Sequence, residues 1–97
     1  MEKLIDIKQL SKGVKFHVIY AEKVISYKFL CVHPDNEQYI IAINNLTKNG
    51  DKIYIAELLQ TDCWVGDFDA IFFLEKEIEY HKKQIEILKE RICVLNK

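Results

Sequence analysis

Hydrophobic residues follow one spacing before residue 66 of the 97-residue chain and a different spacing after it. In the first part they alternate with polar residues in short runs, which is the period-two pattern of half-buried strands. In the second part they recur every three or four residues, as on one face of a helix. The chain is therefore expected to consist of a small β domain over residues 1–66 and a C-terminal helical segment over residues 67–97.

Four strands are predicted in the first part, over residues 14–20, 24–33, 39–46 and 52–58. A tight connection at residues 21–23 joins the first two strands. The second strand ends at a turn over residues 33–36, in which Pro34 suits the second position of a type I turn. Asn49-Gly50 tolerates the positive φ angles that the turn between the last two strands would need. Residues 2–12 are expected to form a short helical turn, or a strand followed by a turn. Four short strands so close together predict a small antiparallel β-barrel or a curled sheet, and we favour an SH3-like barrel.

One long helix is predicted to follow. Residues 59–69 are expected to link it to the strands, because Gly66 interrupts the pattern and either Asp67 or Asp69 can cap a helix. From there to Leu95 the chain contains neither glycine nor proline. This predicts a helix of about 26 residues and roughly 40 Å, and the predicted fold class is α+β.

The predicted helix carries coiled-coil heptads. With Ile71 at position a, every a position is isoleucine and every d position is leucine, except for His81. This choice of residues favours a parallel two-stranded coiled coil. A helix of about 40 Å would overhang a 66-residue domain of roughly 28 Å, so the apolar stripe should be exposed and mark an interface. We therefore expect a homo-oligomer, with a parallel dimer favoured, whose interface residues are Ile78, His81, Ile85, Leu88, Ile92 and Leu95.

Other interpretations of the same stripe stay open. A different protein could cover it, or it could pack on the chain's own sheet. His81 would fix the register of a coiled coil and make it sensitive to pH if it lies in the interface. In the simpler alternative the helix bends there, and His81 points to the β domain or to water.

The densest cluster of aromatic and acidic residues is the candidate partner-binding site, and it comprises Asp62, Trp64, Asp67, Phe68 and Asp69. An exposed tryptophan surrounded by carboxylates would suit a basic protein surface. Alternatively, Trp64 and Phe68 cover the open end of the barrel while the aspartates cap the helix. Phe72 and Phe73 lie off the heptad stripe and are expected to dock the helix onto the sheet.

Charge and cysteine usage exclude several classes of function. The 14 basic and 15 acidic residues give a net charge of −1, which provides no broad positive field for nucleic acid or an anionic membrane. No apolar stretch is long enough to cross a bilayer, so no membrane partner is expected. The three cysteines form no CxxC pair, and no secretory segment is recognised, so we expect a cytoplasmic protein with reduced thiols.

Catalytic motifs are missing from the chain. It contains no glycine-rich phosphate loop, no paired catalytic carboxylates and no GxSxG element. Cys31 and His33 share one face of a predicted strand, and His17 could be a neighbour, as a metal or Cys–His nucleophilic site would require. The ligand spacing typical of zinc is missing, which favours a buried thiol beside a turn histidine. We expect no enzyme, no catalytic residue, no cofactor and no metal.

These patterns favour a non-enzymatic binding or inhibitor-type protein that acts as a homo-oligomer on a protein partner. In general character, so small and lysine-rich a chain is similar to accessory proteins of phages and mobile elements, among which inhibitors of host defence form one class. One alternative is an oligomeric protein that sequesters a small ligand between its subunits. The other is a small nucleic-acid-binding regulator. Its candidate surface comprises Lys8, Lys12, Lys15, Lys23 and Lys28 with Tyr20, Tyr27 and Phe29.

Overall fold

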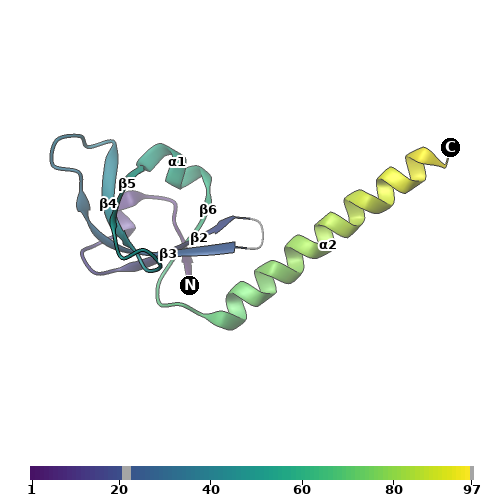
Figure 1. Cartoon of the computed structure of the whole chain (residues 1–97), viewed down its shortest axis with the longest axis horizontal. Coiled ribbons are helices and arrows are strands. Elements are labelled where there is room, and N and C mark those ends of the chain that lie inside the picture. Colours follow the sequence, from purple (N-terminus) through teal and green to yellow (C-terminus); the bar gives the residue numbers. More distant parts are fainter. Residues whose placement is uncertain (21–22, 97) are drawn as a thin grey trace.

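The computed structural model describes residues 1–20 and 23–96. Its elements in chain order are strand β1 (Glu2–Lys3), 3-10 helix η1 (Ile7–Gln9), strands β2 (Lys15–Tyr20), β3 (Lys23–Val32), β4 (Tyr39–Asn44) and β5 (Gly50–Tyr54), helix α1 (Ile55–Gln60), strand β6 (Asp62–Val65) and helix α2 (Ala70–Leu95). The predicted α+β class is confirmed: one antiparallel sheet is followed by a long C-terminal helix (Figure 1).

The strands of the described residues form one open sheet in the order β1-β6-β2-β3-β4-β5. All neighbouring strands are antiparallel. The predicted barrel is therefore not supported, and the open sheet gives no support to an SH3-like arrangement. Closure requires the two edge strands to share a ladder. Here β1 offers only two residues at one edge, and the chain leaves the other edge as helix α1 instead of continuing as a strand.

Two segments differ from the prediction. The strand expected over residues 52–58 ends at Tyr54, and Ile55 begins helix α1. Ile55, Leu58 and Leu59 also fit helical spacing, and so short an apolar run does not distinguish the two states. The expected linker over residues 59–69 contains β6, which lies inside the sheet between β1 and β2. Its four residues do not alternate, because the three apolar residues Cys63, Trp64 and Val65 follow one another, so no strand period is visible.

The turns are only partly as predicted. The loop between β4 and β5 has its positive φ at Lys48, whereas Gly50 already belongs to β5. The Lys48 N–H donates to the Asn44 carbonyl at 2.7 Å, so the loop is longer than a two-residue turn. Near the N-terminus the structure contains parts of both alternatives, because the two-residue strand β1 is followed by the 3-10 helical turn η1. Residues 21 and 22 of the predicted connection at 21–23 lie outside the described residues.

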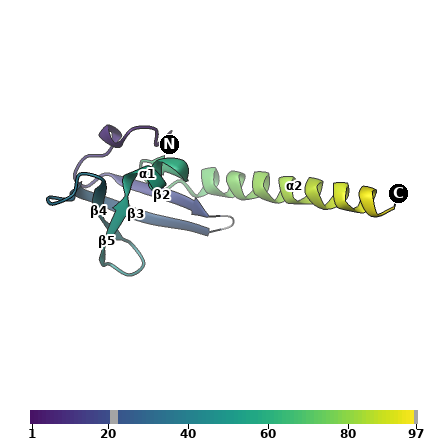
Figure 2. The same ribbon diagram turned by 90° about the horizontal axis from the view of Figure 1, so that it is seen from above.

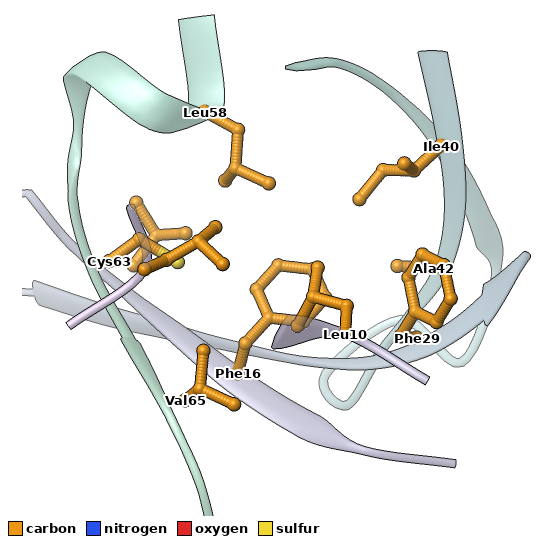
Figure 3. Close-up of a cluster of buried hydrophobic side chains, with 10 residues drawn as sticks. Leu10, Phe16, Phe29, Ile40, Ala42, Leu58, Cys63 and Val65 are labelled. Carbon is orange, nitrogen blue, oxygen red and sulfur yellow. The ribbon is translucent and has the colours of Figure 1, made fainter. Parts of the chain in front are cut away.

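The main core fills the concave side of the curled sheet (Figure 3). Alternating residues of the strands project into it, while helix α1 and the segments flanking η1 cover it, which removes apolar surface from water. The buried hydrophobic residues of this cluster are Leu4, Leu10, Phe16, Val18, Phe29, Ile40, Ala42, Leu58, Cys63 and Val65.

Helix α2 begins on the other face of the sheet and then leaves the domain. The Asp69 side chain caps it by accepting from the Phe72 N–H at 3.2 Å. The predicted 26-residue helix is confirmed, and it gives the molecule a length of 58 Å against 28 and 24 Å in the other directions. Figures 1 and 2 show that most of α2 projects beyond the sheet.

Candidate interaction surfaces

Five rings meet where α2 joins the sheet, and we call His17, Trp64, Phe68, Phe72 and Phe73 the aromatic cluster. His17 on β2 and Trp64 on β6 are register partners, so both project from the face of the sheet opposite the core. Phe73 is buried, and its ring centroid lies 5.3 Å from that of His17 and 5.1 Å from that of Phe68. Phe72 packs against Trp64 at 4.7 Å. The expectation that Phe72 and Phe73 dock the helix onto the sheet is thus confirmed.

His17 links the sheet to the turn that precedes α2. Its side chain is only 1% exposed. Nε2 lies 2.9 Å from the Gly66 carbonyl oxygen and Nδ1 lies 2.7 Å from Ser26 Oγ. Because a carbonyl only accepts, Nε2 carries the hydrogen, and Nδ1 of the neutral ring accepts from the Ser26 hydroxyl. Burial lowers the pKa of His17, since the charged ring loses its hydration.

Trp64 is half-buried and makes polar and aromatic contacts within the protein. Its Nε1–H donates to Asp62 Oδ1 at 2.7 Å. The ammonium group of Lys76 on α2 lies 4.8 Å from the ring centroid, and that of Lys3 lies 6.0 Å away, within the range of cation–π attraction. Trp64 is therefore bordered by two cations and one carboxylate rather than by a ring of carboxylates.

The other members of the predicted partner-binding site separate into two roles. Asp69 caps helix α2. Asp67 is exposed, with one carboxylate oxygen 4.0 Å from the Lys15 ammonium group, and Phe68 is 56% exposed although it touches His17 and Phe73. Of the alternative in which Trp64 and Phe68 cover the open end of a barrel and the aspartates cap the helix, the cap at Asp69 is present. The sheet is open, however, and Trp64 and Phe68 pack against rings of α2. Asp67 and Phe68 form the exposed part of the predicted site.

A second surface runs along α2, and we call it the α2 seam: Ile71, Leu74, Ile78, His81, Ile85, Leu88, Ile92 and Leu95. Its hydrophobic members are 51–84% exposed. His81 Nε2 lies 3.7 Å from Glu77 Oε1 on the same helix. The seam does not pack on the chain's own sheet, and it leaves an apolar stripe facing water that only His81 interrupts.

A notch of about 270 Å³ separates the β2–β3 hairpin from the base of α2. It connects the two surfaces because Leu74 of the seam and Phe68 and Phe73 of the aromatic cluster all line it. Ile19, Val24, Ala70 and Glu77 complete the lining. The notch is thus apolar, with one carboxylate at its wall.

The remaining candidates do not form a chemical site. Cys31 is exposed at the end of β3, and His33 Nδ1 accepts from the Asp35 N–H at 3.1 Å in the following turn. His17 makes its hydrogen bonds elsewhere. No group of three or more His, Cys, Asp or Glu residues within residues 1–20 and 23–96 is arranged to hold a metal ion. Over the same part of the chain, no helix combines the length and the apolar character that a membrane span needs.

The candidate nucleic-acid surface is reduced by the fold. Lys15 and Lys28 are register partners on neighbouring strands and lie on the same face. Phe29, however, belongs to the buried core, and Tyr27 stacks on Phe16 at 5.2 Å. These two rings are therefore not available to stack on bases.

The structural role of His17 was missed at the level of sequence. A signal did exist, since His17 stands between Phe16 and Val18 in a strand and therefore projects from the opposite face. Its partner Gly66 lies 49 residues further along the chain, and no local pattern identifies that contact.

Comparison of the chain with family models, with curated proteins and with solved structures found no match.

Proposed function

We propose that the protein is a non-enzymatic, inhibitor-type binding protein that acts on a protein partner as a homo-oligomer joined through α2. The exposed α2 seam is the observation that carries this proposal. An apolar stripe of this kind on a solvent-exposed surface is typical of an interface. Self-association would bury the stripe and add apolar burial to a small domain that has little of its own.

The described side chains support binding rather than catalysis. Among residues 1–20 and 23–96, His17 is the one polar side chain that is buried. Both of its ring nitrogens are engaged in hydrogen bonds within the protein. A catalytic base needs a free nitrogen or oxygen within reach of a substrate. The balanced charge favours a protein partner over nucleic acid. An accessory role for a phage or mobile element fits a small subunit that acts by occupying a surface.

Sedimentation velocity of the purified protein tests the self-association. We expect the wild type to sediment as an oligomer and the Ile85→Asp/Leu88→Asp variant to sediment as a folded monomer, because each aspartate places a charge in the seam. Lys83→Asp/Glu90→Asp is the matched control, since it puts two aspartates on the same helix away from the seam. A monomeric wild type, or an oligomer that survives the seam substitutions, would contradict the proposal.

Affinity capture from the host lysate tests the partner class. The wild type and the monomeric variant serve as baits, each with and without nuclease. We expect one protein to be retained by the wild type, to survive nuclease treatment and to be retained less by the monomer. Capture that is lost with nuclease and falls steeply with salt would instead indicate the nucleic-acid-binding alternative.

A further inference from the structure

We propose that two copies of α2 pair in antiparallel orientation, so that the tip of each helix covers the base of the other. This inference rests on the proposed self-association and adds its geometry. The occupant of the seam and of the notch beside it is then a second copy of this chain. The Ile and Leu pattern by itself favours the parallel arrangement, but the charges, His81 and the notch all favour the antiparallel one.

The seam residues pair without a gap when the helices overlap along their whole length. In an antiparallel pair, the chain numbering rises along one helix and falls along the other. One register then matches every a position with a d position of the partner. The resulting layers are Ile71 with the partner's Leu95, Leu74 with the partner's Ile92, Ile78 with the partner's Leu88, and His81 with the partner's Ile85.

The charges beside the seam favour this register. It brings Glu77 to the partner's Arg91 and Glu75 to the partner's Lys89. A two-fold axis repeats each contact, so two pairs formed twice give four attractive contacts. They are opposed by one repulsive contact, between Lys82 and the partner's Lys82. A parallel pair would instead form one attractive contact twice, between Glu77 and the partner's Lys82, and would leave the other flanking pairs neutral.

His81 also fits the antiparallel arrangement better. A parallel pair would place it directly against the partner's His81, with two polar rings in one layer of an apolar core. The antiparallel register places it against the partner's Ile85. Glu77, whose carboxylate lies 3.7 Å from His81 Nε2, remains beside it at the edge of the interface.

The notch at the base of α2 would be covered by the same register. Leu74 and Glu77 line it, and they are the residues that meet the partner's Ile92 and Arg91. The apolar tip of one helix, where Ile92 is 58% and Leu95 is 84% exposed, would therefore cover the apolar base of the other. The Glu77 carboxylate at that base would meet the Arg91 guanidinium of the tip. In a parallel pair the two tips meet each other instead, and Leu74 of the notch meets the partner's Leu74.

Mixed disulfide formation tests the orientation. One chain carries Leu74→Cys, and a second, histidine-tagged chain carries Ile92→Cys, so that the products differ in mass. Both also carry Cys31→Ser and Cys93→Ser, which remove the exposed thiols and leave the buried Cys63. The chains are mixed, equilibrated and oxidised, and sedimentation confirms that the reduced mixture is dimeric. Lys83→Cys, on the opposite side of the helix from the seam, is the matched control.

We expect the disulfide between positions 74 and 92 as the main product and little product from any single variant oxidised alone. Disulfides that join 74 to 74 or 92 to 92 would establish a parallel pair and overturn the inference, as would a dimer that yields no mixed disulfide. A trimer or larger oligomer would also overturn it. A monomeric wild type would contradict the proposed function itself, and that result is distinct from all of these.

Charge reversal provides a second test that needs no added cysteine. Glu77→Arg or Arg91→Glu alone should weaken dimerisation by roughly tenfold or more, because each replaces two attractive contacts with two repulsive ones. Both changes in one chain should restore the dissociation constant to near the wild-type value. Glu90→Arg, away from the seam, is the control. Failure of the double variant to recover would contradict the antiparallel register.

Discussion

Truncation of Phe73 should release the base of α2 from the sheet. The Phe73 side chain is 6% exposed and contacts the rings of His17, Phe68 and Phe72. Removing a buried phenylalanine side chain costs about 3–5 kcal/mol of unfolding free energy. Because Phe73 borders the open notch, neighbouring groups and water can enter the vacated space, which places Phe73→Ala at about 3 kcal/mol, the lower end of that range.

Urea unfolding followed by circular dichroism measures this loss. The substitution is made in the Ile85→Asp/Leu88→Asp background, so that the result does not depend on subunit association. With a slope of about 1–2 kcal/mol per molar urea, the midpoint should fall by roughly 1.5–3 M.

Lys83→Ala on the exposed part of the same helix is the control, and it should change the unfolding free energy by less than about 0.5 kcal/mol. A loss below about 1 kcal/mol for Phe73→Ala would refute the reasoning, because it would mean that the helix base contributes little to the fold.

Two further predictions concern buried titratable groups. The pKa of His17 is lowered in the folded state by burial, so stability is full above the ordinary value of about 6.5 and falls as the pH drops from there through the folded pKa. Unfolding free energies between pH 8 and pH 5, again in the monomeric background, should show a smaller loss for His17→Gln than for its parent, and equal losses would contradict the assignment. Burial also raises the pKa of Cys63 to about 12, which leaves it without reactive thiolate. Ellman's reagent at pH 8 should therefore titrate Cys31 and Cys93 in the native protein and Cys63 only after unfolding, and a third fast thiol would show that the core opens at that position.

Local sequence patterns were sufficient to predict the elements whose structure depends on neighbouring residues in the chain. Helix α2 begins after Asp69 and ends at Leu95 because a capping carboxylate precedes a long run without glycine or proline. Three of the four predicted strands, β2, β3 and β4, appear close to their expected bounds, since their side chains alternate clearly. The exposure of the α2 seam followed from comparing the helix length with the size of the domain.

Patterns within short segments were insufficient to predict secondary structure where the choice between helix and strand depends on residues far apart in the chain. The run from Ile55 to Leu58 suits either a strand or a helix. It forms α1 because Leu58 then packs into the core. Likewise β6 is a strand because β1 and β2 pair with it on both sides. The sheet stays open because the edge strand β1 has only two residues and the chain leaves the other edge as α1.

The sequence by itself determined that a small β domain is joined to a long helix. It also determined that the domain is too short to cover the apolar stripe of that helix. Those properties arise from the spacing of residues within one element. The tertiary structure decided that His17 is a buried bridge to Gly66 and that Trp64 and Phe73 are used to dock the helix. It also decided that a notch opens beside Leu74. Each of these depends on contacts between residues far apart in the chain, whose pairing is fixed only when the sheet folds.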